Sequence, residues 1–142
     1  NMFVTLIVGI LDLETGILKL CNAGHNPPIL IYPDGQVSYL EFKTQIFVGV
    51  VEDFKYSDEE VVLEKESKLF LYTDGVTEAE NINKELYGEE KLLEMLSDNA
   101  SSDVRTTVNV VVDSIASHVK EAEASDDLTI LLIQYEPGTA NS

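Results

Sequence analysis

One stretch decides the fold of this chain: Leu69-Phe70-Leu71-Tyr72-Thr73-Asp74-Gly75-Val76-Thr77. Its apolar first half is typical of a buried β-strand, and Asp74 stands where that strand stops. A second motif has the mirrored order, because Ser125-Asp126-Asp127-Leu128-Thr129 leads into the apolar run 130–133. Carboxylates on rigid strand ends suit hard divalent cations, which prefer oxygen ligands. The two strand ends therefore predict a shared cation site.

The composition indicates one globular domain with an acidic surface. The chain has 142 residues, an apolar fraction of 44%, and a net charge of −17 from 26 acidic and 9 basic residues. This charge argues against nucleic acid and anionic membrane as partners, because both require a positive protein surface. No apolar run approaches the ~20 residues of a membrane span. Cys21 is the only cysteine and cannot form an internal disulfide, which favours the reducing cytoplasm.

The first half of the chain predicts antiparallel strands joined by tight turns. Strands over 4–11 and 17–22 flank a turn at 12–16, and strands over 29–32 and 36–40 flank a turn at 33–35. The first strand is β-branched and apolar, so we expect it to be buried. The weak alternation over 55–63 predicts an edge strand.

The apolar spacing then changes to that of helices. One helix is expected over 88–96, with acids in its first turn. Asp103 is expected to cap a second helix, whose apolar stripe is Val104, Val108, Val111, Val112, Ile115 and Val119. A strand over 128–135 closes the fold. The predicted class is α+β, with one domain over 1–136 and a flexible tail over 137–142.

Two Asp-Gly pairs invite different interpretations. Asp34-Gly35 fits a hairpin turn. Asp74-Gly75 does not, because no return strand follows it, and Asp74 is therefore a candidate functional residue. Asp126 and Asp127 are adjacent, and adjacent side chains on extended backbone point to opposite faces, so only one of them can enter a given site. A solvated turn is the alternative for this pair.

The histidines and the cysteine have no partner motif. His25 could be a catalytic base or a ligand, but without a nearby Ser, Cys or second His we expect it to bond to backbone in its loop. His118 is expected to be a favourable charge near a helix C-terminus. Cys21 lies in a predicted strand and is expected to be a core thiol.

Taken in order, the motifs resemble those of the SpoIIE-type (stage II sporulation protein E) phosphatases, which are bacterial members of the metal-dependent type 2C serine/threonine phosphatases. The resemblance runs from Met2 to about Tyr135, and its most specific parts are Asn22-Ala23-Gly24-His25-Asn26-Pro27-Pro28 and Tyr72-Thr73-Asp74-Gly75-Val76-Thr77-Glu78-Ala79. It implies two antiparallel sheets sandwiched by helices and two Mn²⁺ or Mg²⁺ ions bridged by a water. Asp74 and Asp126 match metal ligands, and Asp127 matches a variable second position. The residues expected beside the site are Gly75, Asp127, Asn22 and His25.

The resemblance also implies a substrate class. Family members usually hydrolyse phosphoserine or phosphothreonine on a small anti-anti-sigma (STAS) protein, within partner-switching signalling that regulates sigma factors. Phosphate monoesters hydrolyse extremely slowly unaided, and a two-metal site lowers the pKa of bound water. No catalytic side-chain nucleophile is required, which fits the absence of a Ser-His or Cys-His arrangement.

The chain departs from the family pattern at its start. The strand bearing Gly-Asp-x-x-Asp, which supplies the bridging carboxylate, and the first two helices are not in this sequence. We therefore expect the C-terminal part of a phosphatase domain that binds metal weakly and is nearly inactive. We also expect an uncovered apolar sheet surface, which a second copy covers in a homodimer. The rival hypothesis is a degenerate, non-catalytic phosphatase fold that binds a signalling partner.

Overall fold

The computed structural model of the protein describes residues 2–120, 122 and 127–137. In chain order its elements are β1 (Leu6–Leu11), β2 (Ile17–Ala23), β3 (Ile29–Ile31), β4 (Val37–Tyr39), β5 (Thr44–Gln45), β6 (Glu59–Val62), β7 (Lys68–Tyr72), α1 (Glu89–Asp98), α2 (Val104–Val119) and β8 (Ile130–Gln134). The predicted α+β class is confirmed. None of the described helices combines the length and the apolar character that a membrane crossing requires.

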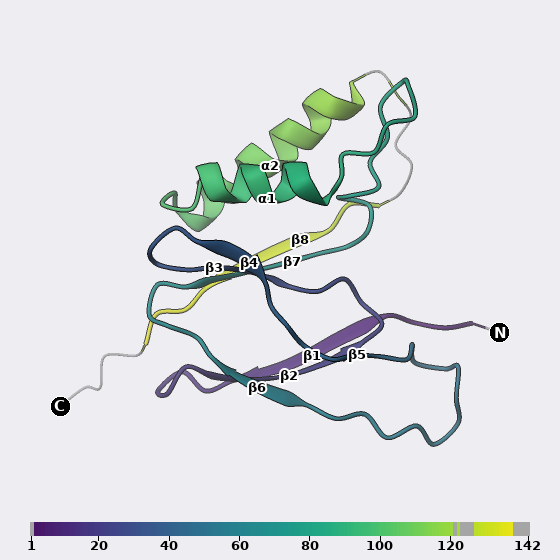
Figure 1. Ribbon diagram of the computed structural model, residues 1–142, viewed down its shortest axis with the longest axis vertical. Coiled ribbons are helices and arrows are strands. Elements are labelled where there is room, and N and C mark those ends of the chain that lie inside the picture. The colour runs from purple at the N-terminus through teal and green to yellow at the C-terminus, as the bar shows by residue number, and fades with distance from the viewer. Residues whose placement is uncertain (1, 121, 123–126, 138–142) are drawn as a thin grey trace.

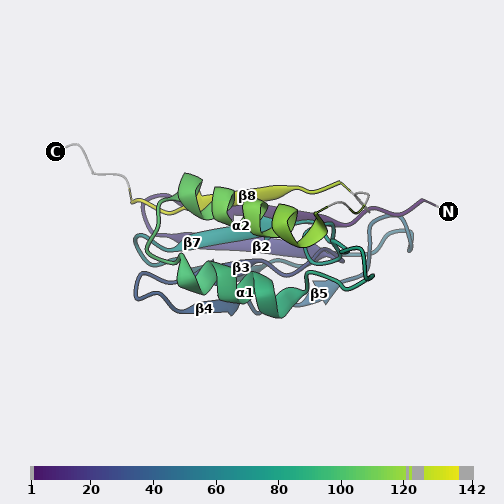
Figure 2. The same cartoon turned by 90° about the horizontal axis from the view of Figure 1, so that it is seen from above.

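The strands form two sheets that stack face to face, with both helices above one of them (Figure 1). In the first sheet, β1 lies beside β2, and β5 and β6 pair with β2. The second sheet has the order β4-β3-β7-β8 and is antiparallel throughout. In the first sheet β5 adds a two-residue parallel pairing to β2. Seen from above, α1 and α2 lie side by side across the second sheet (Figure 2).

The predicted cap of α2 is confirmed, and its apolar stripe is partly so. The Asp103 carboxylate accepts a hydrogen bond from the Thr106 backbone N–H at 3.0 Å. Val111 and Ile115 are buried against the second sheet, but Val112 is 39% exposed. Thr107 is fully buried instead, because it lies four residues before Val111 on the same face of the helix. The predicted stripe is therefore confirmed at Val104, Val108 and Val119, which also pack against this core, and is wrong only at Val112.

Side chains of the second sheet alternate between two cores. Ile29, Ile31 and Phe70 pack against the helices. Leu30 and Leu69 point the other way and pack with Leu18 and Leu20 between the sheets, as the two-residue period of a strand requires. β3 and β7 are thus buried on both faces, which explains the nearly continuous apolar sequence of β7, whereas Leu131 and Ile133 of the edge strand β8 are 54% and 42% exposed.

The first sheet is buried on one face only. Ile7 and Leu11 pack into the inter-sheet core, whereas Leu6, Val8 and Ile10 are 44%, 53% and 70% exposed. The prediction of a buried first strand is wrong for this outer face, because no helix of the described part covers the first sheet (Figure 1). Cys21 alternates onto the same outer face and is half-buried, so the prediction of a core thiol is wrong as well. The expected apolar surface is present.

The turns follow their predicted chemistry. Gly16 and Gly35 have φ values of 74° and 90°, the left-handed conformation that favours glycine. Asp34 is a turn residue, because its carboxylate accepts from the Gln36 backbone N–H at 2.9 Å. The predicted strand over 55–63 is shorter, and β6 pairs only with β2 at the sheet edge.

Candidate functional site

Three motif segments meet at one end of the sandwich. Tyr72, the last residue of β7, pairs with Ile130, the first residue of β8. Ile29 at the start of β3 pairs with Phe70 near the same end of β7. The link 24–28 from β2 to β3 therefore lies at the end where β7 stops and β8 starts (Figure 1). The sequence motifs around His25, Asp74 and Asp127 are gathered there.

At this end the space between the sheets changes from apolar to polar. An apolar cavity of about 250 Å³ lies between the sheets, and it is lined by Ile7, Gly9, Leu11, Leu18, Leu20, Leu63, Leu69, Leu71, Leu131 and Ile133. Two residues beyond Leu20, Leu71 and Ile7, on the same inward faces, come Asn22, Thr73 and Thr5. Polar side chains therefore close this end of the inter-sheet core, where a polar ligand could bind.

Thr73 joins the two carboxylate motifs. Its backbone N–H donates to the Thr129 carbonyl at 3.1 Å. Its hydroxyl donates to the Asp127 carbonyl at 3.3 Å and accepts from the Thr129 N–H at 3.1 Å. The backbone before β8 is thus held on the backbone after β7 by both the main chain and the side chain of one residue.

Gly75 allows these two segments to touch. A Cβ atom on Gly75 would lie 2.4 Å from the Asp127 carbonyl oxygen, which is closer than real Cβ atoms approach. Gly75 is needed for this close approach and not for a positive φ angle. The prediction that Gly75 and Asp127 lie near Asp74 is consistent with this packing.

The backbone around Asp74 is fixed, and its side chain is exposed. The Asp74 carbonyl accepts from the Glu78 N–H at 2.8 Å and from the Thr77 hydroxyl at 3.3 Å. One carboxylate oxygen accepts from the Gly75 N–H at 3.0 Å. A carboxylate fixed in this way at a strand end retains oxygen lone pairs for a cation.

The described residues alone do not complete a metal centre. Among them, no three His, Cys, Asp or Glu side chains are grouped so that they could hold an ion. Asp126, the second predicted ligand, lies outside the described residues, and Asp127 is exposed at their edge. The chemistry of Asp74 fits a hard cation, and a full ligand set would need further oxygen donors in addition to Asp74.

Asn22 holds the His25 loop. Its side chain is 1% exposed, accepts from the His25 backbone N–H at 2.8 Å and donates to the His25 carbonyl at 2.9 Å. Within the described part of the chain the His25 ring bonds to no backbone group, so the expected ring-to-backbone bond is wrong. The ring Nδ1 lies 3.1 Å from the Thr5 hydroxyl. Sequence reasoning missed the role of Thr5, whereas an Asn directly before Ala-Gly could have indicated a side-chain clamp on the loop.

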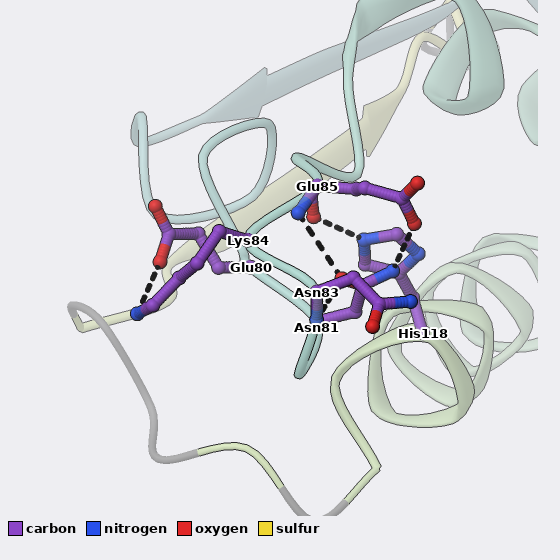
Figure 3. Close-up of polar contacts among 6 residues, drawn as sticks. All are labelled: Glu80, Asn81, Asn83, Lys84, Glu85 and His118. Atoms are coloured by element: carbon purple, nitrogen blue, oxygen red, sulfur yellow. Dashed lines mark hydrogen bonds and ion pairs between the residues drawn. The ribbon is translucent and has the colours of Figure 1, made fainter.

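The segment that follows Asp74 is anchored on α2 (Figure 3). Glu80 and Leu86 form an isolated bridge, and the Asn81 carboxamide oxygen accepts from the Glu85 N–H at 3.1 Å. His118 on α2 lies with Nε2 2.9 Å from the Glu85 carbonyl, so this nitrogen is the donor. No return strand pairs with β7 here, as predicted. We predicted His118 only as a favourable charge near the helix end, and the structure shows that its ring also forms a specific hydrogen bond with the segment after Asp74.

An acidic groove of about 760 Å³ lies next to this segment. Its lining residues are Thr77, Glu78, Leu86, Tyr87, Gly88, Glu89, Glu90, Lys91 and Glu94. Lys91 lies over the Tyr87 ring, with Nζ 4.9 Å from the ring centroid. The glutamates that line the groove, of which Glu78 is four residues after Asp74, give it a negative potential. This potential favours the approach of cations.

The two-sheet architecture and the paired strand ends are those of a type 2C phosphatase domain. The phosphatase domain of the cell fate determinant SpoIIE from Bacillus subtilis, presoaked with Mn, superimposes with a TM-score of 0.72; it is 16% identical, and the match covers 95% of this chain and 58% of that one. The family model of stage II sporulation protein E (SpoIIE) matches residues 1–136. The chain belongs to this family.

Two curated relatives support the assignment. Protein IcfG of Synechocystis sp. (strain ATCC 27184 / PCC 6803 / Kazusa) is 29% identical over 132 residues, which are 93% of this chain and 20% of the relative. Phosphoserine phosphatase RsbU of Bacillus subtilis (strain 168) is 24% identical over 135 residues, which are 94% of this chain and 39% of the relative. The chain thus spans well under half the length of these relatives.

Proposed function

We propose that this chain is part of a metal-dependent protein serine/threonine phosphatase that hydrolyses phosphoserine or phosphothreonine on an anti-anti-sigma (STAS) protein in the cytoplasm. The observation that carries the proposal is the contact between the Asp74 loop and the backbone before β8, through Thr73 and Gly75. Two carboxylate motifs separated by some fifty residues meet at one polar end of the sandwich. Relatives named phosphoserine phosphatases support the reaction class.

In this proposal Asp74 and Asp126 hold part of a centre for two Mn²⁺ or Mg²⁺ ions, with Asp127 beside it. When bound, such ions supply a water of lowered pKa and neutralise phosphoryl charge. Thr73 and Gly75 fix the distance between the two ligand segments. Residues 1–136 form the C-terminal portion of the catalytic domain, and the remaining ligands come from the preceding part of the parent protein. The 142-residue chain itself binds metal weakly and turns over little substrate.

Two Asp-Gly pairs in one chain give a matched test. Asp74→Asn should weaken Mn²⁺ binding, measured by calorimetry and by electron paramagnetic resonance of free Mn²⁺. Asp34→Asn changes the same charge in a hairpin turn and should leave binding unchanged. In parallel, turnover of a phosphoserine STAS substrate at millimolar Mn²⁺ should be much faster for the longer parent than for this chain. Equal turnover would refute the inactivity of the chain, and equal effects of both substitutions would refute the role of Asp74.

A non-catalytic signalling module is the second candidate. It is favoured by the absence of a three-residue ligand group within 2–120, 122 and 127–137. The parent protein discriminates: a Gly-Asp-x-x-Asp strand upstream, together with Mn²⁺-dependent turnover, supports the phosphatase. Binding of the STAS protein without turnover at saturating Mn²⁺ supports the module.

We also propose that two copies associate through the outer face of the first sheet, which exposes Leu6, Val8, Ile10 and Val62. Lys19 and Glu60 on β2 and β6 pair at 2.8 Å, so charges on these strands are partly compensated. Light scattering across micromolar concentrations should give a dimer, and Ile10→Ser should shift it to monomer. Ile82→Ser is the matched control, because both side chains are 70% exposed. A monomer throughout would reject the interface.

A further inference from the structure

We propose that His25 is a phosphate-binding residue of this site and that its Nε2–H donates to a phosphoryl oxygen of the substrate. The inference rests on the proposed phosphatase function and assigns the side chain that faces the anion. The sequence analysis expects His25 only beside the site, whereas this proposal gives His25 a direct contact with the substrate.

The contact with Thr5, just before β1, determines the position of the His25 ring. The His25 Nδ1 lies 3.1 Å from the Thr5 hydroxyl. Thr5 precedes Ile7 by two residues, and Ile7 packs into the core between the sheets. By the two-residue alternation Thr5 is on the inward side just before β1, where it is exposed at the rim of the sheet, and the half-buried His25 ring lies beside it.

The loop that carries the ring is held by contacts that leave Nε2 available. Asn22 bonds to both backbone groups of His25. Gly24 has a φ of 77°, and Phe47 packs where its Cβ would be, with a ring carbon 1.9 Å from that position. In the described part of the chain, His25 Nε2 has no hydrogen-bond partner. When the Thr5 hydroxyl donates to Nδ1, the neutral ring carries its proton on Nε2, and the protonated ring carries one there too.

The corner that carries Asp74 lies at the same end of the sandwich as the ring, because Ile29 pairs with Phe70 and Tyr72 pairs with Ile130. Thr73 follows Leu71 on the inward face of the second sheet, and its hydroxyl holds the Asp127 carbonyl. Packed sheets are separated by about 10 Å, so a phosphoryl group can lie between the two sides. Carboxylates on one side suit cations, and an imidazole N–H on the other suits an anion. The chain has a net charge of −17, which repels an anionic phosphoryl group. Binding of that group therefore requires a hydrogen-bond donor that faces it.

The chain has two histidines, so histidine ring NMR gives an internal control. The probe is inorganic phosphate, added at constant pH and ionic strength to chain labelled with ¹⁵N in its histidine rings, with and without Mg²⁺. The His25 Nε2 resonance should shift with phosphate, and that of His118, whose ring bonds to the Glu85 carbonyl, should not. Equal shifts of both rings would show a medium effect and overturn the inference.

Variants separate a phosphate contact from a structural role. His25→Ala should weaken phosphate binding by roughly tenfold, the effect of losing a hydrogen bond to a charged group. His25→Gln keeps a nitrogen donor on a side chain of similar length and should restore most of the affinity. Thr5→Val removes only the contact that orients the ring and should have an intermediate effect. His118→Gln is the control for substituting a histidine, and thermal unfolding checks that each variant is folded.

The outcomes distinguish this inference from the proposed function. A Mg²⁺-dependent phosphate response of the Asp74 amide with a silent His25 ring would overturn the inference and leave the phosphatase proposal standing. A His25 response without any effect of Mg²⁺ at Asp74 would support the phosphate contact and reject the metal site. A His25 ring that shifts with Mg²⁺ alone would make Nε2 a metal ligand and overturn the inference. Silence of both residues in the longer parent protein, at Mg²⁺ and phosphate concentrations up to saturation, would reject both proposals.

Discussion

Gly75 packs directly against the Asp127 backbone, and a Cβ at Gly75 would stand 2.4 Å from the Asp127 carbonyl oxygen. This one contact determines how closely the segment after β7 approaches the segment before β8. Gly75→Ala should therefore lower the free energy of unfolding by about 1–3 kcal/mol, because a methyl group must displace backbone and not a flexible side chain. Urea unfolding measures it. Gly9→Ala is the control, since its Cβ would meet the nearest atom at 3.4 Å. Equal effects of the two substitutions would contradict the prediction.

Thr73→Val should separate the same two segments without adding bulk. The substitution removes the hydroxyl that bonds to Asp127 and Thr129, and leaves the backbone bond to Thr129 in place. We expect a loss of about 1–2 kcal/mol in the free energy of unfolding, as two hydrogen bonds of ordinary strength are lost. Thr44→Val, at an exposed position of β5, should change stability by a few tenths of a kcal/mol. A stable Thr73→Val protein would show that the hydroxyl bridge is not needed.

Lys68→Met should loosen the turn between the helices. Lys68 is 6% exposed, and its ammonium group donates to the Ala100 carbonyl at 2.7 Å and also to the Ser102 carbonyl. Removing it leaves two carbonyls without this donor, which should cost about 1–3 kcal/mol. Lys65→Met, at an exposed lysine, is the control. Hydrogen exchange should speed up around 99–103 in the first variant only; unchanged exchange there would refute the link.

Tyr72 should make the protein sensitive to alkali. Burial, followed by the neighbouring Tyr39, raises the pKa of Tyr72 well above 10. The folded state therefore favours the neutral phenol, while the unfolded chain ionises near pH 10. This contribution to stability is complete below about pH 10 and is lost as the pH rises further. Tyr72→Phe should flatten the decline measured by chemical unfolding between about pH 9 and 11. Tyr56→Phe, at an exposed ring, controls for the removal of one hydroxyl, and an identical slope in all three proteins would disprove the assignment.

Local sequence patterns predicted the elements of this fold well. The end of β7 at Tyr72, the turn at Gly35 and the Asp103 cap all depend on residues near one another in sequence. The wrong predictions concern what lies across the fold. The burial of the outer face of β1 depends on whether a further layer covers the first sheet. The burial of Thr107 rather than Val112 depends on which face of α2 packs against the second sheet.

The site could be predicted only in part. The place of Asp74 at the end of β7 was recognisable because an apolar strand ended there without a return strand, and its role as a ligand stays a prediction. Thr5 was not, because its contact with His25 spans twenty residues and arises only when β1 and β2 pair. Lys68 was also hidden, since a lysine at the start of a strand usually reaches solvent, and its acceptors come from a turn more than thirty residues later. Asp126 lies outside the described residues and stays a prediction.

The bond between His118 and the Glu85 carbonyl ties α2 to the segment that starts at Asp74. Ala79 accepts from the Tyr87 N–H at 2.8 Å, and the Tyr87 hydroxyl donates to Ser114 on α2 at 3.0 Å, so the tie is made twice. α2 and the segment after Asp74 are consequently joined at two points, so a displacement of α2 would act on the loop that carries the Asp74 carboxylate.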